Sequence, residues 1–338
     1  MRAWLFVVAA LVFAMVVVGG ATRLTDSGLS ITEWQPILGA IPPWSEADWQ
    51  AAFEKYKAIP EYAVINAGMS LAEFKFIYWW EWTHRLLGRL IGVAFAVPFL
   101  AFWVAGMLRP GLPAKLCGIL ALGAVQGFIG WYMVKSGLVD RIDVSQYRLA
   151  LHLLTAFAIL ALLVWFALDA GPPPARVRLQ TVTRGEWRFA ALLFALIFLQ
   201  SGLGALVAGL KAGYAYNTWP LMDGRLVPEG LGALTPWYLN IFENVATVQF
   251  NHRMTAYAVV ALALWHVTAL ARTADDERLV GSAGLLAAAL LAQMGIGIAT
   301  LLGGVPIALG LAHQAGAALV IAAATLHLHG MTRAAARG

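Results

Sequence analysis

Eight stretches of mostly apolar residues constrain this chain more than any other feature of its sequence. They lie near residues 3–21, 77–108, 115–134, 149–170, 189–210, 245–271, 280–302 and 307–329. A helix of about 20 apolar residues crosses the hydrocarbon core of a bilayer. Hydrophobic residues make up 61% of the chain and charged residues 12%, which excludes a water-soluble globule, a disordered chain and a coiled coil. We therefore predict an all-α polytopic membrane protein with eight transmembrane helices in the lipid bilayer.

The charged residues predict how these helices are oriented. Eleven lysines and arginines, against five acidic residues, fall on the side of the N-terminus, which gives that side a net charge of +6 and leaves the other at −1. The positive-inside rule then places both termini in the cytoplasm. This pattern explains the excess of basic over acidic residues, so the excess does not indicate binding to nucleic acid. The predicted outer side carries three long loops, near residues 22–76, 135–148 and 211–244.

The two halves of the chain repeat one another. Matching residues recur in the same order at shifts of 161 to 185 positions, in the pairs Gly28/Gly213, Trp34/Trp219, Gly39/Gly224, His84/His252, Gln126/Gln293, Gly130/Gly297, Gly137/Gly304 and His152/His313. Each repeat has four spans, so both insert with the same orientation. We predict two tandem four-helix bundles, related by a pseudo-twofold axis along the membrane normal. They comprise residues 1–170, with the outer loop 22–76, and 189–338, joined by an inner linker at 171–188.

The first apolar stretch has a second interpretation. Arg2 precedes a run that ends in the small residues Gly19, Gly20 and Ala21, as in a secretory signal peptide. The repeat needs this helix as the counterpart of the fifth span. We therefore predict that it stays in the protein.

Four of the seven histidines share one depth in the predicted membrane. His84, His152, His252 and His313 lie near the outer ends of the second, fourth, sixth and eighth spans, two in each repeat. An ionisable side chain within a span is costly and suggests function, although a histidine bonded to a neighbouring helix is the structural alternative. Two histidines per bundle suit the two axial bonds of a heme iron. The only cysteine, Cys117, excludes a disulfide or cysteine-ligated cluster within the chain.

Charged residues flank these histidines. Four arginines on the outer side either pair with heme propionates or extend to lipid head groups: Arg85, Arg89, Arg148 and Arg253. Glu81 lies one turn before His84, where the other repeat has Gln249. A carboxylate beside only one site predicts chemistry at that site alone. The alternative is an ion pair between Glu81 and Arg85 at the i,i+4 spacing.

Two long segments resemble heme A synthases of the branch shared by mitochondria and alphaproteobacteria. They are GATRLTDSGLSITEW at residues 20–34 and EFKFIYWWEWTHR at residues 73–85, and the resemblance covers essentially the whole chain. It implies an enzyme that oxidises one porphyrin methyl group of heme O to the formyl group of heme A, through two hydroxylations and loss of water. Members of the bacillus-like branch carry a cysteine pair in the first outer loop, which this chain lacks.

The same resemblance implies a role for each candidate residue. His84 and His152 would bind the iron of the substrate heme O and of the product heme A. His252 and His313 would bind the iron of a heme b cofactor, which would relay electrons from an outside donor. Glu81 matches the essential acid of the family. Heme O synthase, cytochrome oxidase assembly factors and a second copy of the chain are the partners we expect.

One alternative function stays open at this point, a di-heme b-type transmembrane electron carrier. Such carriers stack two hemes across the membrane between histidines of the same helices. His252 and His266 lie fourteen residues apart, and so do His313 and His327. We otherwise expect His266, His327 and His329 to lie at the inner interface, since they have no counterparts in the other repeat. A transporter would need broken helices at the midplane, and apart from Pro98 the spans are intact there.

Overall fold

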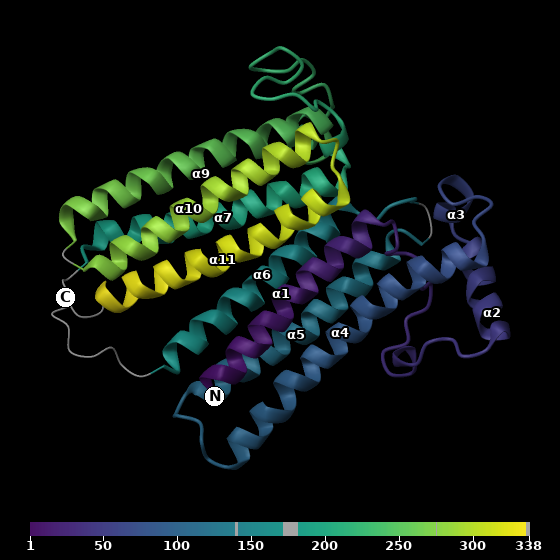
Figure 1. The fold of residues 1–338 in the computed structure, drawn as a ribbon, viewed down its shortest axis with the longest axis horizontal. Coiled ribbons are helices and arrows are strands. Elements are labelled where there is room, and N and C mark those ends of the chain that lie inside the picture. Colours follow the sequence, from purple (N-terminus) through teal and green to yellow (C-terminus); the bar gives the residue numbers. More distant parts are fainter. Residues whose placement is uncertain (139–140, 172–181, 275, 336–338) are drawn as a thin grey trace. The chain divides into compact units, whose positions relative to one another are not determined.

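The computed structural model describes residues 1–138, 141–171, 182–274 and 276–335, and within these ranges the chain forms helices without strands. Eight described helices are long and apolar enough to cross a membrane, which confirms the predicted all-α polytopic class. They are α1 (Arg2–Leu24), α4 (Leu71–Val104), α5 (Leu112–Lys135), α6 (Gln146–Asp169), α7 (Arg184–Gly209), α9 (Val245–Thr273), α10 (Glu277–Leu302) and α11 (Ile307–Ala335) (Figure 1). Most of the predicted linker, residues 172–181, lies outside the described residues.

Capping side chains decide where several of these helices begin. Ser70 and Glu73 form a reciprocal capping box, in which each side chain bonds the backbone N–H of the other residue. This arrangement satisfies two N–H groups that lack partners within the helix. It starts α4 at Leu71, six residues before the predicted span, so the first turns of α4 extend beyond the apolar stretch. A second such box, between Thr183 and Glu186, starts α7.

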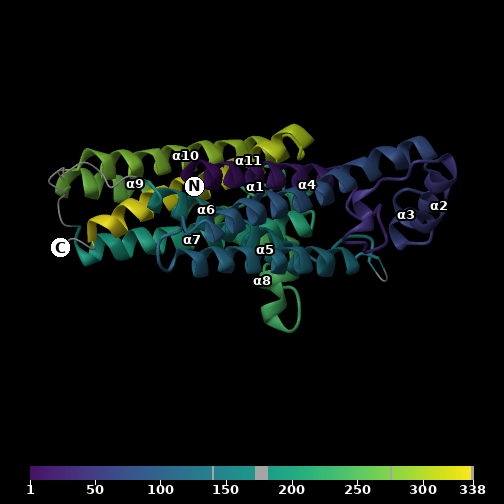
Figure 2. The ribbon, with the colours of Figure 1, turned by 90° about the horizontal axis from the view of Figure 1, so that it is seen from below.

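The chain divides into two compact units, Met1–Ala9 with Leu160–Gly338, and Ala10–Ile159. In the first unit, α7, α9, α10 and α11 form a closed ring, because α7 contacts α9, α9 contacts α10, α10 contacts α11, and α11 contacts α7. Between α7 and α9 a long loop with the short helix α8 (Asn240–Glu243) projects from the ends of these helices (Figure 2). The pseudo-twofold relation between two bundles, and their predicted limits, stay predictions.

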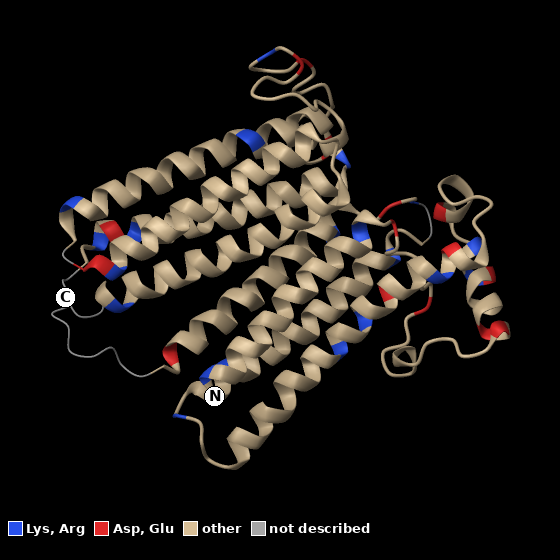
Figure 3. Ribbon diagram, viewed as in Figure 1, with Lys and Arg blue, Asp and Glu red and all other residues tan. Residues whose placement is uncertain are grey.

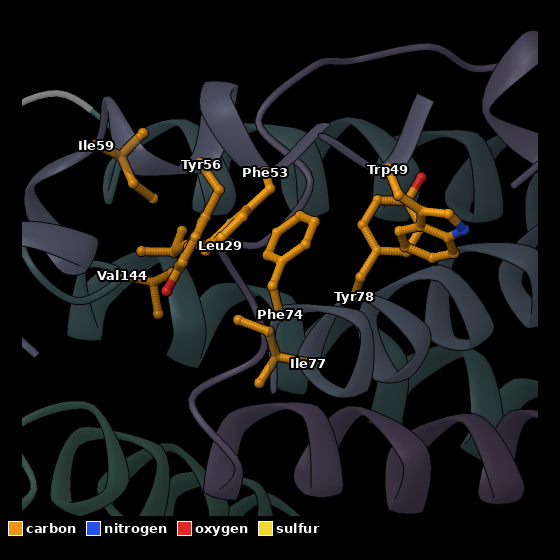
Figure 4. Close-up of a cluster of buried hydrophobic side chains, with 9 residues drawn as sticks. All are labelled: Leu29, Trp49, Phe53, Tyr56, Ile59, Phe74, Ile77, Tyr78 and Val144. Atoms are coloured by element: carbon orange, nitrogen blue, oxygen red, sulfur yellow. The ribbon is translucent and has the colours of Figure 1, made fainter. Parts of the chain in front are cut away.

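The second unit carries a small folded segment next to the N-terminal end of α4. Its helices α2 (Glu46–Lys57) and α3 (Pro60–Val64) lie beside the first turns of α4 (Figure 1). Nine buried side chains hold this segment together: Leu29, Trp49, Phe53, Tyr56, Ile59, Phe74, Ile77, Tyr78 and Val144 (Figure 4). The rings of Phe53 and Phe74 stack with their centroids 4.9 Å apart. The first outer loop is therefore a packed structure with its own core, and it fixes the segment that leads from α1.

Most charged residues lie in the loops and near the helix ends (Figure 3), and the other charged positions inside the helices, such as Arg85 of α4 and Arg253 of α9, leave long uncharged stretches beside them. This distribution is the one that the hydrocarbon core of a bilayer requires. It supports the multi-pass membrane protein predicted from the sequence. We call the helix ends next to the three long loops the outer ends, after the predicted topology.

Candidate functional site

Each of the four predicted iron-ligating histidines packs against a glycine of a neighbouring helix. The pairs are His84 with Gly19, His152 with Gly130, His252 with Gly204 and His313 with Gly297. A Cβ atom at any of these glycines would lie only 2.7 to 3.0 Å from an imidazole atom. Packed heavy atoms prefer separations of about 3.5 to 4.0 Å. The absence of a side chain at each glycine therefore lets the imidazole lie directly against the adjacent helix.

A glutamine stands one turn before three of these glycines and contacts the histidine that the glycine accommodates. The pairs are Gln126 with His152, Gln200 with His252 and Gln293 with His313. In each pair, the amide Nε2 donates to the backbone carbonyl of the histidine at 2.7 to 3.1 Å. It also lies 3.0 to 3.4 Å from a ring nitrogen. The sequence repeat had matched Gln126 with Gln293 but indicated no role, and it missed Gln200.

The histidines of the first unit have the separation that a shared iron requires. The ring centroids of His252 and His313 lie 6.5 Å apart, with the rings at 88°. Two metal–nitrogen bonds of about 2 Å each would place the centres of two axial imidazoles about 6 Å apart. All four histidines are partly exposed. The separation of His252 and His313 fits a bis-histidine heme site, and the repeat-related His84 and His152 occupy equivalent glycine-backed positions.

The three remaining histidines are buried in the protein, and their predicted depth at the inner interface stays a prediction. His266, His327 and His329 have only 2%, 1% and 6% of their surface exposed. His266 and His327 do face each other, but their Nε2 atoms are 2.9 Å apart. This is a hydrogen-bond distance, and it is too short for an iron atom bonded to both nitrogens at about 2 Å each. The inner pair of the electron-carrier alternative therefore forms no heme site in this structure.

Ser282 and Phe189 also pack against the pair of His266 and His327. Ser282 Oγ lies 2.9 Å from Nδ1 of His327, and the ring of Phe189 packs 5.0 Å from that of His266. His329 binds Asp169 at 3.0 Å. These contacts satisfy buried polar groups, which accounts for the inner histidines as structural residues.

Glu81 lies in the second unit with its carboxylate enclosed by donors. Its Oε2 accepts hydrogen bonds from Ser30 Oγ and from the backbone N–H of Ile31, both at 2.7 Å. Its Oε1 accepts from Nε and Nη2 of Arg85 at 3.1 and 2.6 Å. Only 2% of Glu81 is exposed. The ion pair considered from the sequence is therefore present, within a larger set of four donated hydrogen bonds that fixes the carboxylate.

Gln249 occupies the equivalent position in the first unit, but toward its loop it donates hydrogen bonds where Glu81 accepts them. Its Nε2 donates to the backbone carbonyls of Ala212 and Ala215 at 2.8 and 2.6 Å. Its Oε1 accepts from Nη2 of Arg253 at 3.1 Å. An amide can donate and accept, whereas a carboxylate only accepts. The loop of each half therefore presents the backbone groups that match the side chain it meets.

Arg85 and Arg253 each lie one turn after Glu81 or Gln249. Each binds two backbone carbonyls of its loop, and the two pairs of carbonyls are at equivalent positions of the repeat. Arg85 donates to the carbonyls of Ile31 and Glu33 at 2.8 and 3.0 Å. Arg253 donates to those of Tyr216 and Thr218 at 2.6 and 2.9 Å. Ile31 and Tyr216 are separated by 185 positions, as are Glu33 and Thr218, and this is the shift seen in the sequence repeat. The repeat thus extends to individual hydrogen bonds.

The other two predicted arginines also bind backbone carbonyls. Arg89 donates to Gln35 and Pro36, and Arg148 donates to Tyr132 at 2.6 Å and lies over its ring. Among the described residues, Nη1 of Arg89 and Nε of Arg253 are buried without a hydrogen-bond partner. Such unpaired donors are costly to bury, and they leave capacity for an anion such as a propionate.

Comparison with known proteins gives a consistent result over nearly the full chain. Residues 2–325 match the model of the COX15-CtaA family, described as cytochrome oxidase assembly protein. A heme A synthase of Parvibaculum lavamentivorans is 54% identical over 330 residues, which cover 98% of this chain and 94% of that protein. Heme A synthases of Chelativorans sp. and Agrobacterium fabrum are 54% and 51% identical, covering 96% and 98% of this chain and 89% and 90% of those proteins.

Proposed function

Because the chain belongs to the COX15-CtaA family of cytochrome oxidase assembly proteins, we propose that it oxidises a porphyrin methyl group of heme O to the formyl group of heme A. Relatives that share more than half of its sequence carry the name heme A synthase. One observation of the structure supports this function above all others. Two histidine pairs occupy equivalent glycine-backed places, and only one of them has a carboxylate one turn away, at Glu81.

The two pairs differ in what they hold. His84 and His152 bind the iron of the substrate heme O and then of heme A. His252 and His313 bind heme b, which supplies one-electron redox chemistry when bound. This assignment is supported by the neutral Gln249 beside the second pair, where an amide in place of a carboxylate removes the proton acceptor. The free donors of Arg89 and Arg253 are suited to heme propionates.

Glu81 acts on the methyl group. Two successive hydroxylations and the loss of water from the resulting gem-diol convert a methyl to an aldehyde. Each hydroxylation adds one oxygen atom and removes two electrons from the carbon, so it needs an oxidant and an oxygen source from outside the chain. A carboxylate held by four hydrogen bonds is fixed in orientation and would accept or return the protons that these steps move. Ser30, whose Oγ lies 2.7 Å from Glu81 Oε2, is placed to pass such a proton onward. Arg85 donates to the other carboxylate oxygen, so it acts as a positioning residue for Glu81.

We infer the location of the protein from its proposed role in making heme A for cytochrome oxidase and from the excess of positive charge on the side of the termini. We place it in the inner membrane of a bacterium, with both termini in the cytoplasm and the two heme sites near the outer face. Heme O synthase and cytochrome oxidase assembly factors are the partners that supply the substrate and use the product, and a homo-oligomer is compatible with these roles. A reporter active only in the periplasm, fused after Gly338, should stay silent, and strong signal there would overturn the topology.

Production of heme A in cells tests the function directly. Cells that lack their own heme A should be given this chain together with a heme O synthase, and the extracted hemes should be separated by chromatography. We expect heme A only when both proteins are present, with heme O alone in the cells that have only its synthase. A purified protein that holds heme b in two sites and makes no heme A would restore the electron-carrier alternative.

A further inference from the structure

The first outer loop exposes a run of apolar residues that lies outside both histidine pairs. Residues 36–44, with the sequence PILGAIPPW, carry no charge, and we call them the apolar loop. Ile37, Leu38 and Trp44 have 84%, 70% and 82% of their surface exposed, and Ile41 is exposed as well. A group of exposed apolar side chains of this kind marks a site of contact with a partner or with a membrane.

Arg89 fixes the apolar loop against α4 at the level of the membrane. Its Nε and Nη2 donate to the backbone carbonyls of Pro36 and Gln35 at 2.8 and 3.0 Å. Gly39, in the short 3-10 helix η1 (Leu38–Ala40), also lies against it, since a Cβ there would be 3.1 Å from Nη2. From position 86 to its C-terminal end, α4 has no charged residue other than Arg89, and about 20 such residues fill a bilayer core. The apolar loop therefore lies beside the outer edge of the hydrocarbon core.

The backbone of the apolar loop has few polar groups left to hydrogen-bond with water. Three of its residues are prolines, which have no N–H group. Three more N–H groups donate to carbonyls of residues 35–38 at 3.0 to 3.1 Å, those of Gly39, Ala40 and Ile41. A backbone can approach lipid only when its polar groups are satisfied within the protein. A surface that docks another protein has no such need, because the partner and bridging water supply hydrogen bonds.

The corresponding loop of the other half is charged. The shift of 185 positions pairs residues 36–44 with residues 221–229, which include Asp223, Arg225 and Glu229. Nη1 of Arg225 lies 2.6 Å from Oε1 of Glu229, and both side chains are exposed. Such charges are costly in lipid. The two loops therefore correspond in position along the repeat and differ in the surroundings that they suit.

Exposed side chains of α4 continue the apolar surface from the loop along the helix. Leu90, Val93 and Val97 follow Arg89, and each has more than half of its surface exposed. Their spacing of three and four residues places them on one face of α4. Because this part of α4 lies in the predicted hydrocarbon core, these side chains meet lipid. The apolar loop extends that lipid-facing surface at its outer end.

We propose that the apolar loop is a membrane anchor, held on α4 by Arg89, which inserts four side chains into the outer leaflet of the bilayer: Ile37, Leu38, Ile41 and Trp44. The backbone stays at the level of the lipid head groups, a depth at which tryptophan is favoured. Ser30 and Ile31, which bind Glu81, precede the anchor by a few residues. The anchor therefore ties the segment that encloses Glu81 to the membrane surface.

Spin labels at matched positions of the two loops test the anchor. Cys117→Ala removes the only cysteine, and Ile41→Cys or Leu226→Cys then places one label at exposed positions that are 185 residues apart. The purified full-length protein should be placed in nanodiscs of phosphatidylcholine and phosphatidylglycerol, with one chain per disc. Power saturation of the electron paramagnetic resonance signal measures collisions with oxygen, which dissolves in lipid, and with a nickel chelate, which stays in water. We expect the ratio of oxygen to nickel collisions to be several-fold higher at position 41 than at position 226.

Two results of this measurement would overturn the anchor. A label at position 41 that favours nickel as much as the label at position 226 lies in water, as a docking surface for another protein would in discs that hold only this chain. A label that meets neither reagent is covered by protein. Should Ile41→Cys not fold, Ile37→Cys repeats the measurement at a site that is equally free of packing.

Charged substitutions separate the insertion of the side chains from the position that Arg89 gives the loop. With the label at position 41, Ile37→Asp combined with Leu38→Asp should lower the collision ratio several-fold, because carboxylates oppose insertion. Val64→Asp, at an exposed site of α3 in the same outer loop, should leave the ratio unchanged. An unchanged ratio in the double variant would show that these side chains do not anchor the loop. No heme or turnover enters these measurements, so their result is independent of the proposed function.

Discussion

Glu81 with Arg85, and Gln249 with Arg253, each hold an outer loop to a helix, and we call each such pair a clamp. The two clamps are built alike and differ in one side-chain group, a carboxylate in the first and an amide in the second. In both, an arginine one turn after the Glu or Gln donates to two loop carbonyls at equivalent positions. Glu81 meets a hydroxyl and an N–H of its loop, whereas Gln249 meets two carbonyls. An amide therefore suffices to close such a clamp. The comparison indicates that the carboxylate of Glu81 serves something beyond folding.

Replacing Glu81 gives the largest effect that this comparison predicts. Glu81→Gln keeps the shape but removes the proton acceptor, and heme A formed per folded molecule should fall about 100-fold or more, as when a general acid or base is lost. Heme O or a hydroxylated intermediate should accumulate, while heme b is retained. Extraction and chromatography of hemes from the purified variant measures this. Near-normal heme A would leave Glu81 with only its ion pair to Arg85.

The reverse change in the other clamp is the control. Gln249→Glu would place a carboxylate against the carbonyls of Ala212 and Ala215, which can only repel it. We expect a lower yield of folded protein, with heme A formation per folded molecule nearly unchanged. Equal losses of product in the two variants would show that the clamps are catalytically equivalent and would break the comparison.

The outer and inner histidines of the same helices give the next effect. His252→Ala removes an iron ligand and should strip most heme b from the purified protein, by about tenfold or more. His266→Ala removes a partner from a closed hydrogen-bonded pair and should leave the heme in place, although an unsatisfied His327 costs about 1–3 kcal/mol of stability. Heme content by the pyridine hemochrome spectrum distinguishes them. Equal heme loss in both variants would revive the stacked electron carrier.

The glycines behind the histidines should have a smaller effect. A Cβ at Gly297 would lie 2.7 Å from the ring of His313, whereas a Cβ at Gly295 on the same helix meets nothing within 4 Å. Gly297→Ala should therefore displace His313 and lower heme b occupancy several-fold, and Gly295→Ala should not. Gly130→Ala, behind His152, should lower hemin binding at the His84–His152 site and leave heme b in place. This result would show that the glycines act separately in the two halves. Unchanged occupancy in Gly297→Ala would show that the ring can move aside without loss.

The smallest effect concerns the outer loops and pH. Burial raises the pKa of Glu61 to about 8, opposed by a hydrogen bond from Tyr56 and assisted by the nearby carboxylates of Asp26, Glu81 and Asp143. In the other half, the long loop is held by the neutral amide of Asn240. Between the ordinary value of 4.5 and about 8, folded Glu61 keeps a proton that the unfolded chain releases. Stability should therefore fall as pH rises through that window and then level off.

Thermal unfolding at pH 5, 7 and 9 measures this dependence. Glu61→Gln resembles the protonated form, so it should flatten the decline and stabilise the protein most at the highest pH. A slope identical to that of the unchanged protein would assign the pH dependence to other groups.

The sequence by itself determined the features that depend on local composition and order. Eight apolar stretches specify eight helices because a backbone in lipid must satisfy its hydrogen bonds within each segment. The repeat predicted one depth for His84, His152, His252 and His313, and the two motifs indicated the family that the comparisons confirmed. The asymmetry between Glu81 and Gln249 was also legible, since it needs only the order of residues along the chain.

Tertiary structure alone decided which faces of these helices meet. A membrane helix is apolar toward lipid and toward its neighbours, so hydrophobic periodicity does not show which residues lie between helices. The contacts of glycine with imidazole and the glutamine beside three of the histidines depend on that choice. The same holds for the arginines, which the sequence analysis assigned to propionates or lipid and which the fold directs to backbone carbonyls of loops and, for Arg148, of α5. It also holds for His266 and His327, whose 2.9 Å contact arises because α9 and α11 lie in one ring of helices and turn these residues inward.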